Sequence, residues 1–441
     1  MAPETLAVLM FVSLFVLVFL GIPISFSLLA TAFVFGLQAF GPNVVGTQLS
    51  GMILQTAQQF LLSAVPPFII MGCILERSGI AERLFQTMQL WLGRLPGGLA
   101  LATISMSAIF AASTGIVGAV EVVIGVMAIP VMLKYRYNKD LIAGTICAGG
   151  SLGTMIPPSL VAVIYASVAN MSVGKLLAAM VLPGLLMVAA FLIYIIVRCL
   201  LWPEHGPPVP SEQRNANFRE KLMISVTGLV PATLLIIAVL GSILWGVASP
   251  TEAASVGAIG AVLLTAAYGR LSWPVITDTL RRTILINCMI MLIVVGGTMF
   301  TSVFRVLGGE RLVATVVADL GLGKGMVIFI CLGIVFLAGF ILDWVSIVLI
   351  CLPIFLPLIA LAKIDPIWFA VMMVIMIQTS YLTPPMAPSI FYLRSIAPPE
   401  ITYKDMCLGV APYVVCQLLT LLAVVLFPWL TTYLPQQMSG F

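Results

Sequence analysis

The sequence has 441 residues, of which 61% are hydrophobic and only 8% are charged. A soluble domain carries about 25% charged residues, and no core of a chain this long could bury so much apolar surface. The composition therefore excludes a soluble protein and predicts a polytopic membrane protein of α-helices. The net charge of +4 is too small to indicate nucleic-acid binding.

The first half of the chain predicts five membrane spans, an amphipathic arm at the membrane interface and one long apolar segment. The spans are expected near 5–20, 22–39, 53–75, 140–169 and 175–201, with the arm at 76–94 and the apolar segment at 95–133. Because Met-Ala-Pro-Glu lacks the basic start of a signal peptide, we expect the first helix to be retained.

A stretch rich in proline and charge, 202–221, cannot cross a bilayer and is predicted to be a cytoplasmic linker. Beyond it, 222–441 repeats the order of the first 201 residues. Spans are expected near 222–246, 251–268, 283–305, 366–394 and 405–433, an arm at 306–323 and an apolar segment at 325–362. Three motifs recur 227–229 residues later, which predicts an internal repeat: Glu82-Arg83-Leu84 as Glu310-Arg311-Leu312, Pro157-Pro158 as Pro384-Pro385, and Pro183 as Pro412.

The apolar segments 95–133 and 325–362 are either two short spans each or re-entrant hairpins, and in both cases the chain returns to the side it left. Each half then crosses the membrane an odd number of times, so the second half is inverted relative to the first. With both termini in the periplasm, 15 of the 20 Lys and Arg residues are cytoplasmic. The positive-inside rule therefore favours this orientation.

Two predicted spans contain paired prolines beside hydroxyl groups, at 149–159 and 378–389. Proline removes a backbone donor and clashes with the preceding turn, so each span should be a broken helix, with the breaks near Pro157 and Pro384. A single such motif could be a simple kink, and Gly149 with Gly153 could serve helix packing alone. Discontinuous helices at matching positions of inverted repeats indicate a transporter site, where freed carbonyl oxygens can replace the hydration shell of a small cation.

Two carboxylates lie inside the apolar segments, Glu121 in the first and Asp343 in the second. An intramembrane acid is a functional hypothesis because its burial is costly. Asp343 is expected at the second tip, where it could bind a cation or fix the hairpin. For Glu121 a structural hydrogen bond is an equal alternative.

Enzyme and metalloprotein functions find little support in the sequence. Gly149-Gly150-Ser151-Leu152-Gly153 matches a serine-nucleophile pattern, but it lies within a span, and the only histidine, His205, falls in the linker. The eight cysteines form no CxxC pair, and there is no phosphate-binding GxxxxGK[ST] loop. We therefore expect no enzyme activity, no resident metal or cofactor, and no ATPase function in this chain.

The order of these motifs resembles the large membrane subunit of tripartite ATP-independent periplasmic (TRAP) transporters, which is DctM-like. The resemblance is carried by an arm, Ala-Ser-Thr-Gly, Gly-Thr-x-Ile-Pro-Pro-Ser and Leu-Thr-Pro-Pro-x-x-Pro, and it covers essentially the whole chain. It implies the ion-transporter fold with re-entrant hairpins and an elevator motion. It also implies three further components of transport: sodium as coupling ion, a DctP-like periplasmic binding protein that delivers an organic acid anion, and a separate DctQ-like four-helix membrane subunit.

The resemblance implies two sodium sites and a substrate site between them, facing Ser159, Ser389 and the N-termini of the half-helices. The first sodium site would consist of Ser113, Thr114, Gly115, Gly149, Thr154 and Pro157. The second would consist of Gly339, Asp343, Gln378, Thr379, Thr383 and Pro384.

The alternative is a stand-alone symporter of the same superfamily, coupled to sodium or protons and independent of a binding protein. A neighbouring gene for a secreted binding protein would separate the two hypotheses. The sequence does not identify the substrate, the number of sodium ions or the oligomeric state.

Overall fold

Within the described residues of the computed structural model, all regular structure is helical. These residues are 3–115, 117–209, 218–312, 315, 323–385 and 387–438. The helices of the first half are α1 (Pro3–Phe19), α2 (Ile24–Phe40), α3 (Pro42–Ala57), η1 (Phe60–Ala64), α4 (Val65–Arg77), α5 (Ile80–Leu92), α6 (Gly98–Thr114), α7 (Val117–Lys134), α8 (Lys139–Ser151), η2 (Leu152–Thr154), α9 (Leu160–Val168), α10 (Val173–Leu201) and, at the start of the linker, η3 (Pro203–His205).

The second half supplies a similar series of helices. They are α11 (Phe218–Ile236), the π-helical η5 (Ile237–Gly241), α12 (Ser242–Leu244), α13 (Pro250–Ala267), α14 (Trp273–Val306), α16 (Lys324–Ala338), α17 (Trp344–Leu361), α18 (Pro366–Leu382), α19 (Pro388–Arg394), α20 (Tyr403–Leu426) and α21 (Trp429–Gln437).

Local sequence explains where several of these helices begin. Ser249 and Thr402 each accept a backbone N–H at the start of α13 and α20, and an acidic residue three positions later completes a capping box. Asn138 and Asp365 cap α8 and α18 in the same way, without the reciprocal contact. The two broken helices therefore begin at defined polar residues.

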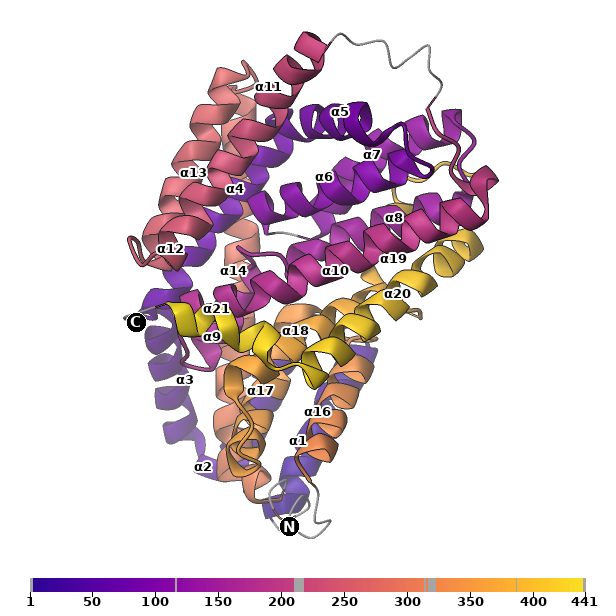
Figure 1. Ribbon diagram of the computed structural model, residues 1–441. Coiled ribbons are helices and arrows are strands. Elements are labelled where there is room, and N and C mark those ends of the chain that lie inside the picture. The colour runs from indigo at the N-terminus through magenta and orange to yellow at the C-terminus, as the bar shows by residue number, and fades with distance from the viewer. Residues whose placement is uncertain are drawn as a thin grey trace.

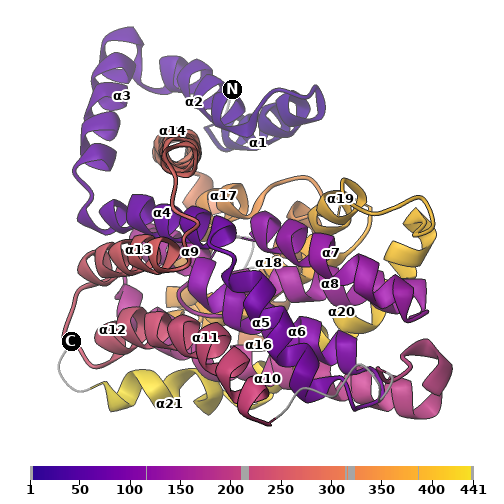
Figure 2. The ribbon, with the colours of Figure 1, turned by 90° about the horizontal axis from the view of Figure 1, so that it is seen from above.

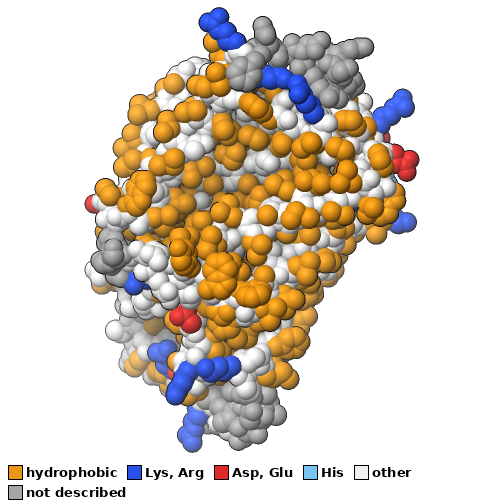
Figure 3. Space-filling model, in the orientation of Figure 1, with side chains coloured by type: hydrophobic (Ala, Val, Ile, Leu, Met, Phe, Trp, Pro, Cys, Tyr) orange, Lys and Arg blue, Asp and Glu red, His pale blue; other side chains and the backbone are white. Residues whose placement is uncertain are grey.

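One face of the molecule is apolar across its middle (Figure 3). Figure 3 shows hydrophobic side chains covering the central part of one face, while Lys and Arg side chains gather toward two opposite ends. Leu263 and Phe329 are 65% and 72% exposed, which fits contact with lipid rather than water. By length and apolarity, 7 of the described helices can cross a membrane, and five shorter helices are also apolar.

The helices of the two halves are interleaved. Helix α8 packs against α20, α10 against α18, and α7 against α19. Helices of the two halves also pack together at α2 with α14 and at α4 with α13. Figure 1 shows α10 and α20 crossing the middle of the molecule side by side, and Figure 2 shows α1, α2 and α3 along one side of it, next to α14.

The bounds of the helices recur at a nearly constant offset. Helix α6 starts at 98 and α16 at 324, 226 residues later. The offset is 227 for α7 and α17, 227 for α8 and α18, and 228 for α9 and α19. The halves thus share one order of elements, in which a helical hairpin precedes a helix broken by prolines.

Two of the predicted spans have wrong bounds. The span expected at 53–75 consists of the end of α3, the short η1 and α4, whereas the second half has the continuous 34-residue helix α14 at the matching place. The span expected at 405–433 ends at Leu426, and α21 follows as a separate helix. Half of the second arm, 306–323, lies outside the described residues.

The start of the predicted linker is tied to the first half by backbone hydrogen bonds. Gly206 accepts from the Gly97 N–H at 2.8 Å, His205 accepts from Asn138 at 3.0 Å, and Val209 donates to Gly93 at 3.0 Å. Residues 203–209 therefore hold the end of α5 and the bases of α6 and α8 together, while residues 210–217 lie outside the described residues.

Candidate functional site

The first broken helix consists of α8, the short η2 and α9. Helix α8 ends at Ser151 and α9 starts at Leu160, so the chain between them leaves the α-helical path within a buried region. Pro157 and Pro158, which are joined by a cis peptide bond, are both buried. Neither proline can donate a backbone hydrogen bond, which explains why the helix is interrupted here.

The tip of the first hairpin, formed by α6 and α7, lies against this break. Gly115 ends α6 with a φ of +64°, and a Cβ atom on it would lie 2.7 Å from the carbonyl oxygen of Pro158. Only glycine fits both that φ and that approach. Since η2 also packs on α6, the end of α6 with Ser113, Thr114 and Gly115 lies against the segment that contains Thr154 and Pro157.

Gly149 faces a different part of the first hairpin. A Cβ atom on it would lie 2.4 Å from Ser107 Oγ, almost two turns before the tip. Close packing of α8 on α6 therefore explains why position 149 is a glycine.

The second broken helix consists of α18 and α19 and is more open. Thr383 is half-buried at the end of α18, and the cis pair Pro384–Pro385 is exposed. Ala387 then starts α19 with a φ of +35°. This helix has only seven residues.

The tip of the second hairpin, formed by α16 and α17, meets α18 at a serine. A Cβ atom on Gly339 would lie 2.0 Å from Ser380 Oγ, so this tip also requires glycine. Asp343 caps α17, where its carboxylate accepts hydrogen bonds from the Val345 N–H, at 3.2 Å, and from the Ser346 hydroxyl. The position of Asp343 near the tip agrees with the sequence prediction.

The hydroxyl groups at both breaks share one orientation. Each donates its proton to a carbonyl oxygen three or four residues earlier in its own segment, at 2.7–3.0 Å. A hydroxyl has one donor and two acceptor lone pairs, so its lone pairs remain available to a cation. The residues with this arrangement are Ser113, Thr114, Thr154, Thr379 and Thr383.

Gln378 does not join the second tip through any hydrogen bond of the described residues. Its amide Nε2 instead donates to Ser151 Oγ at 3.1 Å, and Gln417 Nε2 lies 3.5 Å from the same oxygen. Ser151 and Gln378 are 227 residues apart and occupy matching positions in the two halves. Sequence analysis missed this contact, although the constant offset was the signal that could have revealed it.

The two serines expected at the substrate site are both buried but differ in their partners. Ser159 Oγ donates to the Thr154 carbonyl oxygen at 2.6 Å, which ties the start of α9 to the end of η2. Ser389 Oγ, on α19, has no hydrogen-bond partner among the described residues.

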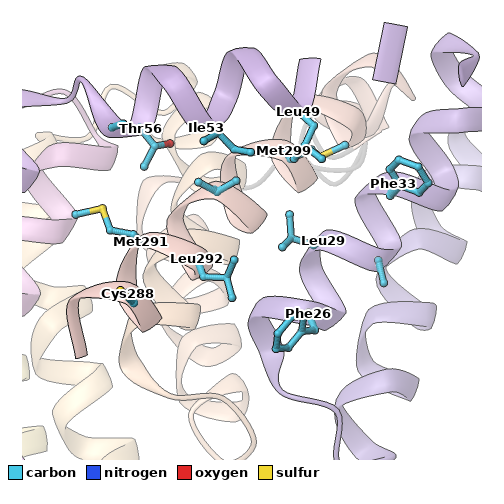
Figure 4. A pocket seen from close by; sticks show the side chains of 13 residues that line it. Phe26, Leu29, Phe33, Leu49, Ile53, Thr56, Cys288, Met291, Leu292 and Met299 are labelled. Atoms are coloured by element: carbon cyan, nitrogen blue, oxygen red, sulfur yellow. The ribbon is translucent and has the colours of Figure 1, made fainter. Parts of the chain in front are cut away.

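Cavities lie on both sides of α14. A cavity of about 730 Å³ between α2, α3 and α14 is lined almost entirely by apolar side chains, which Figure 4 shows around Leu29, Leu292 and Met299. It suits no organic anion. A second cavity, of about 430 Å³ between α14 and α17, includes Thr298, Thr301 and Arg305 in its lining and is the more polar of the two.

A model of one protein family matches residues 11–430, nearly the whole sequence. Its description is the DctM component of the tripartite ATP-independent periplasmic transporters. The chain belongs to this DctM family.

Relatives of this DctM protein are large permease proteins of TRAP transporters. A C4-dicarboxylate permease protein of Pseudomonas aeruginosa is 31% identical over 360 residues, covering 81% of this chain and 82% of the relative. A sialic acid permease protein of Vibrio cholerae is 29% identical over 434 residues, covering 96% and 97%. An isethionate permease protein named DctMQ, from Oleidesulfovibrio alaskensis, is 28% identical over 94% of this chain but only 63% of the relative.

Among solved structures, the YdaH transporter of Alcanivorax borkumensis has the same fold, with a TM-score of 0.62 at 17% identity over 88% of this chain and 89% of that one. The family and its relatives confirm that the DctM protein is a multi-pass membrane subunit of a secondary transporter and not an enzyme. As a DctM component, it is one part of a tripartite assembly.

Proposed function

We propose that this chain forms the translocation pathway of a sodium-driven importer of an organic acid anion in the cytoplasmic (inner) membrane, with both termini in the periplasm. The observation that carries the proposal is the repeated meeting of a glycine hairpin tip with a proline break, at Gly115 with Pro158 and at Gly339 with Ser380. Each meeting brings neutral oxygen atoms together inside an apolar protein.

Sodium is the proposed coupling ion because it is a hard cation that prefers oxygen ligands. The first site would use Ser113, Thr114, Thr154 and the backbone at Gly115 and Pro157. The back-bonded hydroxyl groups present unused lone pairs there. The second would use Thr379, Thr383 and the backbone at Gly339 and Pro384, with Asp343 close to the tip. Gly149 and Gln378 would act by packing and by joining the two halves.

The substrate would pass between a moving unit and a stationary frame. The moving unit would comprise both hairpins and both broken helices. The frame would comprise α2, α4, α13 and α14, in which helices of the first half pack against helices of the second half. Two inverted repeats, with the hairpins re-entrant, would give this unit matched access to either side of the membrane. The cavity lined by Thr298, Thr301 and Arg305 lies where α17 faces α14, and its polar lining suits an anion in transit.

Two further components are proposed as partners, a small four-helix membrane subunit and a periplasmic binding protein that delivers the anion. The names of the relatives concern C4-dicarboxylates and sialic acid, which supports an organic acid as the transported class. The isethionate relative DctMQ extends well beyond the part that this chain matches, which leaves room in it for a fused second subunit.

Reconstitution in proteoliposomes tests the proposal. The chain would be purified with its small subunit, and uptake of a radiolabelled acid would be measured with and without a sodium gradient and with and without the binding protein. We expect uptake only when both are present. Uptake without the binding protein would favour a stand-alone symporter, and uptake that ignores sodium would contradict the sodium sites.

A further inference from the structure

Glu121 is a fully buried carboxylic acid near the start of α7. Its side chain is 0% exposed, and neither carboxylate oxygen has a hydrogen-bond partner among the described residues. Packing alone does not explain an acid at this position, because an apolar side chain would fill the space without the cost of burying a carboxyl group.

The packing around Glu121 leaves no space beside it on α8. A Cβ atom on Gly150 would lie 1.7 Å from Glu121 Cγ, so the acid occupies the space that any other residue at 150 would fill. Neither Gly150 nor Ser389, the residues found against Glu121, belongs to a proposed sodium site. A hydrated or multiply coordinated cation therefore does not fit here, whereas a proton needs no added space.

No charged side chain of the described residues offsets the charge of Glu121. No basic or acidic side chain of the described residues interacts with it electrostatically, although α4 and α5, which also pack on α7, carry Glu76, Arg77, Glu82 and Arg83. Two titratable side chains do interact electrostatically with Glu121, Cys147 on α8 and Tyr381 on α18. Thiols and phenols of these types are neutral at physiological pH. Tyr392 of α19 packs one turn away, at Gly118.

One polar group faces Glu121, the hydroxyl of Ser389 on α19. Ser389 is also fully buried, and its hydroxyl, too, has no hydrogen-bond partner within the part of the chain that the structure describes. The serine hydroxyl can donate to the acid in either protonation state. An added proton removes the buried negative charge, which no basic side chain of the described residues offsets, and lets the neutral acid also donate to the serine oxygen. The two unpaired groups would then satisfy each other.

We propose that Glu121 and Ser389 form a proton-binding site between the first hairpin and the second broken helix, and that its proton is a further coupling ion. The coupling rests on the proposed transport function, whereas the proton site itself does not. The carboxylate takes one proton from water as α7 and α19 pack together, forming an O–H bond. The same bond breaks, and the proton returns to water, when α7 and α19 separate within the moving unit and expose the acid.

Infrared difference spectroscopy of the purified complex in lipid tests the proton site directly. At neutral pH, the wild type should show the carbonyl stretch of a protonated carboxylic acid, and Glu121→Gln should lose that band. Ser389→Ala should keep the band and shift its frequency, because only the hydrogen bond is removed. Glu400→Gln, which alters an exposed acid outside the proposed sites, should leave the band unchanged. A wild-type spectrum without the band, or a band that survives in Glu121→Gln, would overturn the proposal.

Transport measurements test the coupling. With the sodium gradient held constant, an inward proton gradient should raise wild-type uptake several-fold and should leave Glu121→Gln unaffected, since glutamine keeps the shape but cannot ionise. Equal stimulation of both proteins would refute the coupling. A complex that ignores sodium yet keeps the infrared band would contradict the proposed function and leave the proton site standing.

Discussion

The two breaks have the same plan but differ in how they are covered. Pro157 and Pro158 are buried, and Gly115 closes over them against a backbone carbonyl group. At the second break Pro384 and Pro385 are exposed, and Gly339 meets the side chain of Ser380 instead. One structure therefore contains a covered and an exposed version of the same break. We expect ions and water to reach the second site first.

The largest effect should come from the tip glycines. Gly115→Ala forces a Cβ atom onto the Pro158 carbonyl and keeps a left-handed φ that costs about 1–2 kcal/mol, so uptake should be lost. Gly339→Ala should also lose uptake, but adding Ser380→Gly should restore much of it, because the obstruction there is a side chain. Proteoliposome uptake measures both.

Gly333→Ala is the control for these variants, since nothing lies within 4 Å of a Cβ atom at that position of α16. It should transport like the wild type. If Gly115→Ala retained full uptake, the first tip would not depend on its close approach to the break.

Loss of one hydroxyl ligand should have the next largest effect. Thr154→Ala and Thr383→Ala should each raise the sodium concentration for half-maximal uptake about tenfold, which corresponds to about 1.4 kcal/mol per site. Their combination should be worse than either alone. Unchanged sodium dependence in the double variant would refute both sites.

Chemical labelling should separate the closed and open sites by several-fold in rate. In a background without reactive native cysteines, Pro384→Cys should react with a water-soluble thiol reagent faster than Pro157→Cys, because position 384 is exposed and position 157 is buried. Denatured protein should label equally at both positions. Equal rates in the folded complex would show that the difference in cover does not persist in the membrane.

The smallest effect should come from the contact that joins the two breaks. Ser151→Ala and Gln378→Leu each remove one partner of the 3.1 Å hydrogen bond. A double-mutant cycle by thermal unfolding of the complex should give a coupling free energy of about 1 kcal/mol. Additive effects would show that the pair does not stabilise the folded protein.

The sequence predicted those parts of the site that depend on local chemistry. The paired prolines at 157–158 and 384–385 remove two adjacent backbone donors, so the breaks in the two helices were predictable. Gly115 and Gly339 precede Pro157 and Pro384 by 42 and 45 residues, and the sequence left open whether the segments that contain them are hairpins or paired spans. The surroundings of Glu121 could not be predicted from the sequence, because Glu121 meets Gly150 and Ser389 only through tertiary packing. The span at 53–75 was predicted wrongly since hydropathy measures apolar length, and η1 with α4 is as apolar as an unbroken helix.

The exchange of partners between the halves bears on how the chain is synthesised. When the ribosome has completed the first repeat, α8 still lacks α20, α4 lacks α13, and the Ser151 hydroxyl lacks the Gln378 amide. Until the second half is inserted, the polar groups of the first half must therefore form hydrogen bonds with water, lipid or the insertion machinery. Packing between the halves is completed only when the second half has been synthesised, so a chain that ended after the first half would leave these interfaces open.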